Sequence, residues 1–302
     1  MHRRFRHDRS SSANPRVTIT VKFWGARGSI PTPGPGTARY GGNTACLTVS
    51  DGGHLVILDA GSGLRPLGHE LMARRGPLTA DILLSHTHWD HIQGLPFFKP
   101  LSAPGNEFCI YGAAQNDVGL EEILRRQMDP MVFPVPLQAL AARLNVTEIE
   151  PGEFALGGLE VGAFRLRHPG TTLGYRLRPR GGGPAVAYLT DNELGEGGDY
   201  PVGPGWRAEL VRFLDGTETL IHDAMYAEQI IQARRGWGHS TPRQAVALAA
   251  DAGCRRLVLF HHEPEHDDAA LDRLLEDTRG FAARAAPGLI VEAAAEGMEV
   301  AL

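Results

Sequence analysis

The feature that most constrains this chain is residues 85–91, Ser-His-Thr-His-Trp-Asp-His, where four side chains of metal-binding type fall within six positions. The stretch directly follows an apolar run at residues 82–84, which predicts a buried strand. Because alternate residues of an extended chain point the same way, His86 and His88 are predicted to share one metal ion. The aspartate and last histidine lie past the strand end and are predicted to face a second site. Imidazole nitrogen and carboxylate oxygen suit zinc, manganese or iron rather than calcium or magnesium.

Two later strand-like segments also end in residue types that bind metals. Residues 159–166 lead to His168, and residues 185–189 lead to Asp191. Taken alone, either residue is more often part of a turn. Together, a histidine and an aspartate just past strand ends are what a site along a sheet edge requires, so we expect both beside residues 85–91.

The last buried strand, at residues 256–260, delivers two adjacent histidines. The alignment of the strand end favours His261 as a metal ligand, and His262 is the competing choice that the sequence leaves open. An earlier strand, at residues 54–58, ends in Asp59 and a run of small residues. Small residues at this point let the backbone come close to a neighbouring site.

His239 stands beside the predicted start of a helix. Thr241 and Gln244 form a capping-box pattern, and Pro242 takes the favoured first helical position. A helix N-terminus readily holds a phosphate and makes a nearby imidazolium a somewhat stronger acid. His239 therefore lies where a phosphate could be held, with an ordinary cap beside a surface histidine as the alternative.

Two loop residues are candidates for substrate contact. Residues 25–36 are too rich in glycine and proline for regular structure and form either a surface loop or a lip over the active site. Arg27 within them is a candidate contact for an anionic substrate, with plain solvation as the alternative. Asn43 follows two glycines and is the second candidate, although such a stretch also suits a simple turn.

Composition narrows the class of protein. A chain of 302 residues with 42% hydrophobic content can bury a full core. The net charge of −5 gives no overall basic surface for nucleic acid. Three widely spaced cysteines form neither a disulfide framework nor a zinc ribbon and fit a reducing compartment. No run approaches the ~18 apolar residues of a membrane span, so we expect a cytoplasmic protein without a membrane partner.

The chain is predicted to form one domain. Residues 1–15 are basic and rich in serine but lack the apolar segment of a secretory signal, so we expect a disordered tail. A single domain is predicted over residues 16–302. Its least regular part, residues 100–150, is expected to be an insertion that flanks the active-site mouth and shapes substrate choice.

The letters His-Thr-His-Trp-Asp-His at residues 86–91 resemble the HxHxDH signature of the metallo-β-lactamase superfamily. The resemblance implies an αββα sandwich, with a two-metal site along one edge of the sheets. It spans nearly the whole chain after the tail, with the motifs in the family's order, and implies that Asp59 orients the ligand loop. The seven ligands it implies are His86, His88 and His168 on one ion, Asp90, His91 and His261 on the other, and Asp191 between them.

Two further details of the resemblance concern the reaction. An aspartate at the bridging position, Asp191, resembles the phosphodiesterase, glyoxalase and lactonase branches, because true β-lactamases usually carry cysteine or serine there. Asp223 and His239 look like the acidic-residue and His-Ser-Thr motifs of the tRNA 3′-processing endonuclease (tRNase Z) and the cyclic-phosphate phosphodiesterases. This implies that His239 contacts the phosphate or protonates the leaving oxygen, oriented by Asp223.

The expected function is hydrolysis of a small cyclic or nucleotide phosphodiester. Two divalent ions would share a bridging hydroxide that attacks phosphorus; zinc is the expected ion, with manganese or iron as alternatives. Asp90 and Asp223 complete the catalytic set, and His239 is the expected general acid.

Three other functions stay open at this point: a tRNA 3′-processing endonuclease, a lactone or thioester hydrolase, and a metal-stabilised nucleotide-binding protein without turnover. The first needs a basic surface, for which the sequence offers only local patches at residues 125–126 and 234–235. Nucleic acid is therefore not the expected partner. A homodimer stays open, because members of the superfamily often dimerise.

Overall fold

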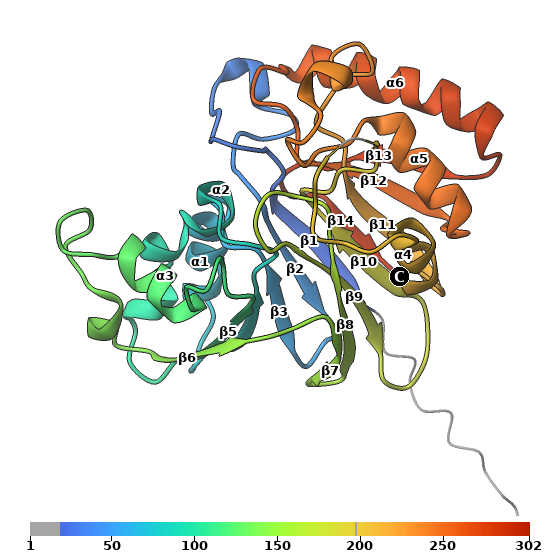
Figure 1. Ribbon diagram of the computed structural model, residues 1–302. Helices are drawn as coiled ribbons and strands as arrows, with labels where there is room; N and C mark the ends of the chain where they lie inside the picture. The colour runs from blue at the N-terminus through green and yellow to red at the C-terminus, as the bar shows by residue number, and fades with distance from the viewer. Residues whose placement is uncertain (1–18, 197) are drawn as a thin grey trace, which may run out of the picture.

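The computed structural model describes residues 19–196 and 198–302, so the tail expected at residues 1–15 lies outside the described residues. Two seven-stranded sheets lie at its centre (Figure 1). In spatial order the first sheet contains β14 (Glu299–Ala301), β1 (Thr20–Gly25), β2 (Cys46–Ser50), β3 (Leu55–Leu58), β4 (Thr79–Leu83), β5 (Glu107–Gly112) and β6 (Arg143–Glu148). The second contains β13 (Ile290–Ala293), β12 (Arg256–Phe260), β11 (Thr217–Asp223), β10 (Ala185–Leu189), β9 (Leu173–Pro179), β8 (Leu159–Arg165) and β7 (Gly152–Leu156).

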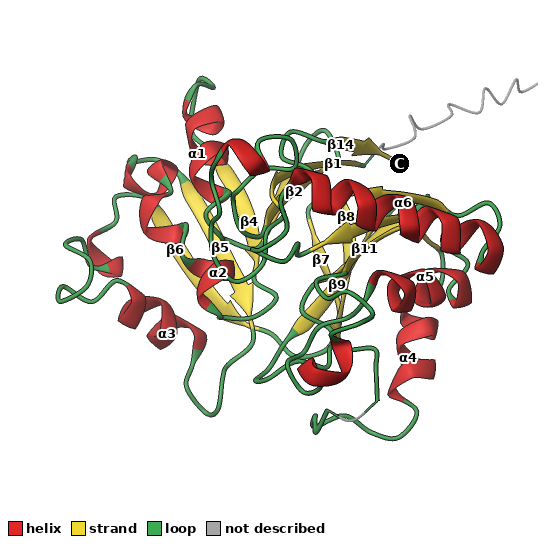
Figure 2. Cartoon of the chain, turned by 90° about the horizontal axis from the view of Figure 1, so that it is seen from above, coloured by secondary structure: helices red, strands yellow, loops and turns green. Residues whose placement is uncertain are grey.

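Helices cover the outer face of each sheet (Figure 2). Those beside the first sheet are α1 (Leu64–Met72), α2 (Trp89–Ile92) and α3 (Leu120–Gln127). Those beside the second are α4 (Trp206–Phe213), α5 (Pro242–Asp251) and α6 (Asp268–Ala285). Short 3₁₀ turns complete the connections: η1 (Pro35–Thr37), η2 (Leu95–Phe97), η3 (Lys99–Ser102), η4 (Leu137–Ala139) and η5 (Ile231–Arg234). Separate apolar clusters lie between the sheets and under each helical layer, so the αββα sandwich predicted from the sequence is confirmed.

The alternation of buried residues along the strands builds the core between the sheets. On β1, Val21 and Phe23 are buried while Lys22 between them is partly exposed. The ring of Phe23 lies 6.2 Å from that of Phe260 on β12, which joins the two sheets. Truncating such a ring typically costs about 3–5 kcal/mol of stability.

Parallel pairing brings several strand ends to one edge. In the first sheet β3, β4 and β5 run parallel, and in the second β10, β11 and β12 do. Leu58 of β3 lies opposite Leu83 of β4, and Leu189 of β10 lies opposite His222 of β11. Ligands in open α/β sheets bind outside such carboxyl ends. The residues that follow these strands are therefore the ones placed to form a site.

Residues 100–150, expected as an insertion, contribute two regular strands to the first sheet. β5 and β6 pair in parallel from Glu107 opposite Arg143 to Gly112 opposite Glu148. The residues between them, which include α3 and η4, connect the two strands. Among the described residues, no helix has the length and apolar character needed to span a membrane.

Candidate metal centre

The strand ends of both sheets meet at one cluster of histidines and aspartates. His86 and His88 follow β4, and α2 begins immediately after them. His168 lies in the turn between β8 and β9, Asp191 follows β10, and His261 follows β12. The two sheets therefore contribute side chains to the same place from opposite sides.

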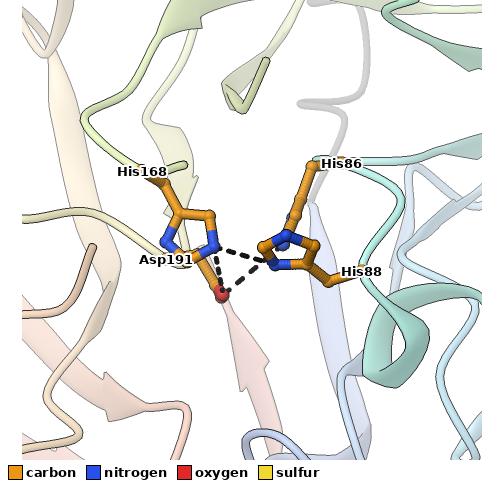
Figure 3. A group of neighbouring side chains, drawn as sticks. All are labelled: His86, His88, His168 and Asp191. Atoms are coloured by element: carbon orange, nitrogen blue, oxygen red, sulfur yellow. Dashed lines mark hydrogen bonds and ion pairs between the residues drawn. The ribbon is translucent and has the colours of Figure 1, made fainter. Parts of the chain in front are cut away.

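The first group consists of His86, His88, His168 and Asp191 (Figure 3). Their candidate ligand atoms all lie within 4.8 Å of one another. Asp191 Oδ2 is 3.6 Å from His86 Nε2 and 3.5 Å from His168 Nε2, and His168 Nε2 is 3.0 Å from His88 Nδ1. His88 is the exposed member of the group, so the site opens to solvent on its side.

The second group consists of Asp90, His91 and His261. Asp90 Oδ2 lies 3.2 Å from both His91 Nε2 and His261 Nε2. The other oxygen of Asp191, Oδ1, is 3.2 Å from His91 Nε2 and 3.1 Å from His261 Nε2. The two oxygens of Asp191 thus face the two groups, which is the arrangement that a bridging carboxylate requires.

The electrostatics of the cluster fit divalent cations. His86 Nε2 and His91 Nε2 are buried and have no hydrogen-bond partner, which is unusual for buried polar atoms. Burial lowers the pKa of His86 well below its ordinary value and that of His168 to about 4, so both imidazoles are in the neutral form that binds metals. Burial acts to raise the pKa of Asp191, but the surrounding histidines outweigh it and hold that pKa well below its ordinary value.

His91 differs from His86 and His168 in the direction of its pKa shift. Burial acts to lower its pKa, but the carboxylates of Asp90, Asp191 and Asp59 together raise that pKa well above its ordinary value. The three buried carboxylates therefore favour positive charge at this place.

Asp59 supports the cluster through hydrogen bonds to the residues around it. Its carboxylate accepts hydrogen bonds from His91 Nδ1 at 2.8 Å, from the Ser85 amide at 2.7 Å and from the Tyr188 hydroxyl at 2.6 Å. Because His91 Nδ1 donates to Asp59, Nε2 is the nitrogen left for the second group. These contacts agree with the expectation that Asp59 orients the ligand loop.

Backbone strain concentrates at the same strand ends. Asp59, Asp191 and His261 adopt left-handed conformations with φ of 60°, 52° and 60°. Such conformations cost about 1–3 kcal/mol each in a residue other than glycine and typically occur at functional sites. Gly28 also packs against this point, because a Cβ there would lie 2.5 Å from the His261 ring.

His239 and Asp223 lie directly beside the cluster. His239 Nδ1 is 2.7 Å from Asp223 Oδ2, and the His239 ring stacks on that of His261 at 5.1 Å with an interplanar angle of 17°. Burial acts to lower the pKa of His239, but the Asp223 carboxylate raises it to about 9. The predicted capping box of Thr241 and Gln244 is present at the start of α5. His239 therefore sits between a helix N-terminus and the candidate ligands.

The choice between the two adjacent histidines follows from their contacts. His261 points its Nε2 at the two aspartates of the cluster, as described above. His262 Nε2 donates to the Ala294 carbonyl at 2.8 Å, and the His262 ring packs edge-on against Tyr40. The structure therefore brings His261 to the cluster and gives His262 a different partner.

Arg27 and Asn43 are not brought to the cluster. Arg27 is fully buried, and its guanidinium donates to the carbonyls of Gly41 at 2.8 Å and His266 at 2.5 Å. Asn43 Nδ2 donates to Glu296 at 3.1 Å, and its side-chain oxygen accepts from a serine hydroxyl. Their side chains join loops to one another, and their expected substrate contacts stay predictions.

The loop that contains Arg27 nonetheless reaches the site through its backbone. The Ser29 amide donates to Asp90 Oδ2 at 2.7 Å. Ser29 itself has a positive φ of 61°. Of the two alternatives for residues 25–36, a surface loop or a lip over the active site, this main-chain contact with a candidate ligand favours the lip.

Glu193 is a site-supporting residue that the sequence analysis missed. It lies two residues after Asp191 and is only 2% exposed. Its Oε2 accepts from the amides of Gly236 at 2.9 Å and Gly238 at 3.0 Å. The Gly238 carbonyl accepts in turn from His168 Nδ1 at 3.1 Å. A glutamate so soon after a strand-end aspartate was the available signal.

Comparison with known proteins identifies the family. The profile of the family described as "Beta-lactamase superfamily domain" matches residues 54–262. The chain belongs to the β-lactamase superfamily. It is a metal-dependent hydrolase of the metallo-β-lactamase fold, as the resemblance at residues 86–91 implied.

Individual relatives agree with this assignment. The chain is 25% identical over 301 residues to ribonuclease Z of Methanosarcina acetivorans, covering 86% of this chain and 92% of that protein. It is 27% identical over 269 residues to ribonuclease BN of Escherichia coli O6:K15:H31, covering 75% and 84%. The crystal structure of unliganded yeast PDE1 shares the fold with a TM-score of 0.67 at 15% identity, covering 95% of this chain and 100% of that one.

Proposed function

We propose that this protein is a dinuclear-metal phosphodiesterase that hydrolyses a small cyclic or nucleotide phosphodiester, with His239 as its general acid. One observation carries the proposal: the ring of His239, which is hydrogen-bonded to Asp223, stacks on the ring of His261, and His261 belongs to the cluster of seven candidate metal ligands. Phosphoryl transfer needs positive charge at the phosphate oxygens and a proton at the leaving oxygen. Metal ions held by the cluster would supply the positive charge, and His239 of the pair would supply the proton.

The ligand assignment is part of the proposal. His86, His88 and His168 would hold one ion, Asp90, His91 and His261 the other, and Asp191 would join them. Two divalent ions held there would supply Lewis acidity and an activated water. Zinc is the ion we propose, since nitrogen ligands outnumber oxygen ligands. A homodimer and a cytoplasmic location stay predictions.

The residues of the chain have distinct roles in this reaction. Asp223 holds the Nδ1 hydrogen of His239, which leaves Nε2 as the nitrogen that donates to the departing oxygen. The N-terminus of α5, which begins three residues after His239, favours the negative charge of a phosphate. The Ser29 amide fixes Asp90 in place, so this carboxylate keeps its orientation toward His91 and His261.

A tRNA 3′-processing endonuclease is the second candidate, because the matched relatives from Methanosarcina and Escherichia are named ribonuclease Z and ribonuclease BN. The net charge of −5 favours a small substrate over a polyanion. A lactone or thioester hydrolase is less favoured, because it leaves the Asp223–His239 pair without a role. A binding protein without turnover is less favoured as well, because the ligand set is complete.

The deciding experiment is a substrate panel on protein of known metal content. Bis(p-nitrophenyl) phosphate, a cyclic nucleotide, a tRNA precursor and a lactone would be compared in the wild type and in His86→Ala. We expect about two metal ions per chain, diesterase turnover, and loss of both in the variant. Full turnover by a His86→Ala protein that has lost its metal would refute the proposal. Cleavage of the tRNA precursor alone would establish the second candidate.

A further inference from the structure

A solvent-exposed tryptophan stands at the edge of the candidate centre. Trp237 lies two residues before His239, and its side chain is 52% exposed. Tryptophan, tyrosine and arginine are the residue types enriched where binding energy concentrates. Trp237 has none of the roles proposed for His239, Asp223 and the candidate ligands.

The loop that carries Trp237 is fixed on both sides of the indole. The amides of Gly236 and Gly238 both donate to the buried carboxylate of Glu193, which also accepts from the Tyr200 hydroxyl at 2.5 Å. Gly238 has a φ of +85°, and a Cβ there would lie 1.9 Å from His168 Nδ1. The exposed indole is therefore held at a set distance from the candidate ligand His168 rather than on a free loop.

One face of the indole is covered by a cation. The guanidinium carbon of Arg234 lies 4.3 Å from the centre of the Trp237 ring and 5.9 Å from that of Tyr226. Tyr226 in turn packs edge-on against His239, with ring centres 5.4 Å apart. With Arg234 on one face and half of the side chain exposed, the opposite face of Trp237 is the surface left for a ligand. A flat aromatic face next to a positive charge and a phosphate site suits a nucleotide.

We propose that Trp237, backed by Arg234, stacks on the nucleobase of the substrate, which makes the substrate a nucleoside phosphodiester rather than a simple alkyl or sugar phosphodiester. This inference rests on the proposed phosphodiesterase function and narrows its substrate class. Trp89, the other strongly exposed tryptophan at 73%, begins α2 between the proposed ligands His88 and Asp90, so it is the competing candidate for stacking on the base.

The test compares two ligands that differ only by a base. Binding of adenosine 5′-monophosphate and of ribose 5-phosphate to zinc-loaded protein would be measured by isothermal titration calorimetry. We expect the nucleotide to bind roughly 5- to 150-fold more tightly in the wild type, the range that stacking on one aromatic side chain provides. The ratio should fall to near one in Trp237→Ala and stay largely intact in Trp237→Phe. It should also persist in Trp89→Ala, with zinc content measured on each variant.

Either of two results would overturn the inference: equal affinity for the two ligands in the wild type, or a preference that survives Trp237→Ala. Loss of the preference in Trp89→Ala alone would assign the base to the other tryptophan and also overturn it. Turnover of bis(p-nitrophenyl) phosphate by the same preparation distinguishes failure of the Trp237 inference from failure of the proposed phosphodiesterase function. Metal-dependent turnover without a base preference refutes only the role of Trp237, whereas absent turnover refutes the phosphodiesterase itself.

Discussion

Tyr188 and Tyr175 lie directly opposite each other on β10 and β9, and each donates its hydroxyl hydrogen to the other sheet. Tyr188 donates to the Asp59 carboxylate, and Tyr175 donates to the Leu84 carbonyl, both at 2.6 Å. Both side chains are fully buried. This cross-strand pair therefore ties the second sheet to the loops of the first sheet that position the candidate ligands.

The two tyrosines give a matched test of how strongly the sheets are joined. Tyr188→Phe removes a hydrogen bond to a charged acceptor and should cost about 1.5–3 kcal/mol of unfolding free energy. Tyr175→Phe removes one to a neutral carbonyl and should cost about 0.5–1.5 kcal/mol. Urea denaturation of the metal-free proteins measures both values. Equal losses, or a larger loss for Tyr175→Phe, would contradict the claim that the hydrogen bond to Asp59 contributes more stability than the bond to the Leu84 carbonyl.

Asp59 should control metal affinity without binding the metal. Asp59→Asn replaces the carboxylate that accepts from His91 and Ser85 by an amide that cannot accept as strongly, so His91 loses its fixed orientation. We expect metal affinity to fall about 10- to 100-fold. Competition with a zinc chelator measures this affinity. Asp81→Asn is the control, because Asp81 pairs with His54 instead. An equal loss of metal affinity in Asp81→Asn would show that the loss comes from lower overall stability and not from the contact between Asp59 and His91.

The strand ends and their ligands could be predicted from the sequence because their signals are local. An apolar run followed at once by histidines or aspartates specifies both a strand and what it delivers. The hydrogen bond between Tyr188 and Asp59 spans 129 residues of sequence and depends on how the two sheets pack, which no local pattern encodes. Arg27 shows the same limit: the sequence offers substrate contact and solvation as its alternatives, whereas tertiary packing buries its side chain completely.

The cysteines should differ sharply in reactivity, because the thiolate is the reactive form. Burial raises the pKa of the Cys254 thiol to about 12 and that of Cys46 well above its ordinary value. Cys109 is partly exposed. In the native protein we expect Ellman's reagent to react rapidly with Cys109 alone, both at pH 7 and at pH 9. Cys46 and Cys254 should react only after unfolding. Cys109→Ser should abolish the fast phase, and a fast phase that persists would contradict this assignment.

The general-acid role of His239 can be separated from simple phosphate binding by the leaving group. An alkoxide leaving from a cyclic nucleotide needs a proton in the transition state, whereas p-nitrophenolate leaves readily without one. His239→Gln should therefore lower kcat on the order of 10²–10⁴-fold for the cyclic nucleotide and much less for bis(p-nitrophenyl) phosphate. Asp223→Asn should follow the same pattern to a smaller extent, because the imidazole stays but loses the carboxylate that orients its Nδ1 hydrogen. Metal content, measured on each variant, should match the wild type. Equal losses on both substrates would show that His239 binds the phosphate rather than protonating the leaving oxygen, and full turnover on both would remove it from the reaction.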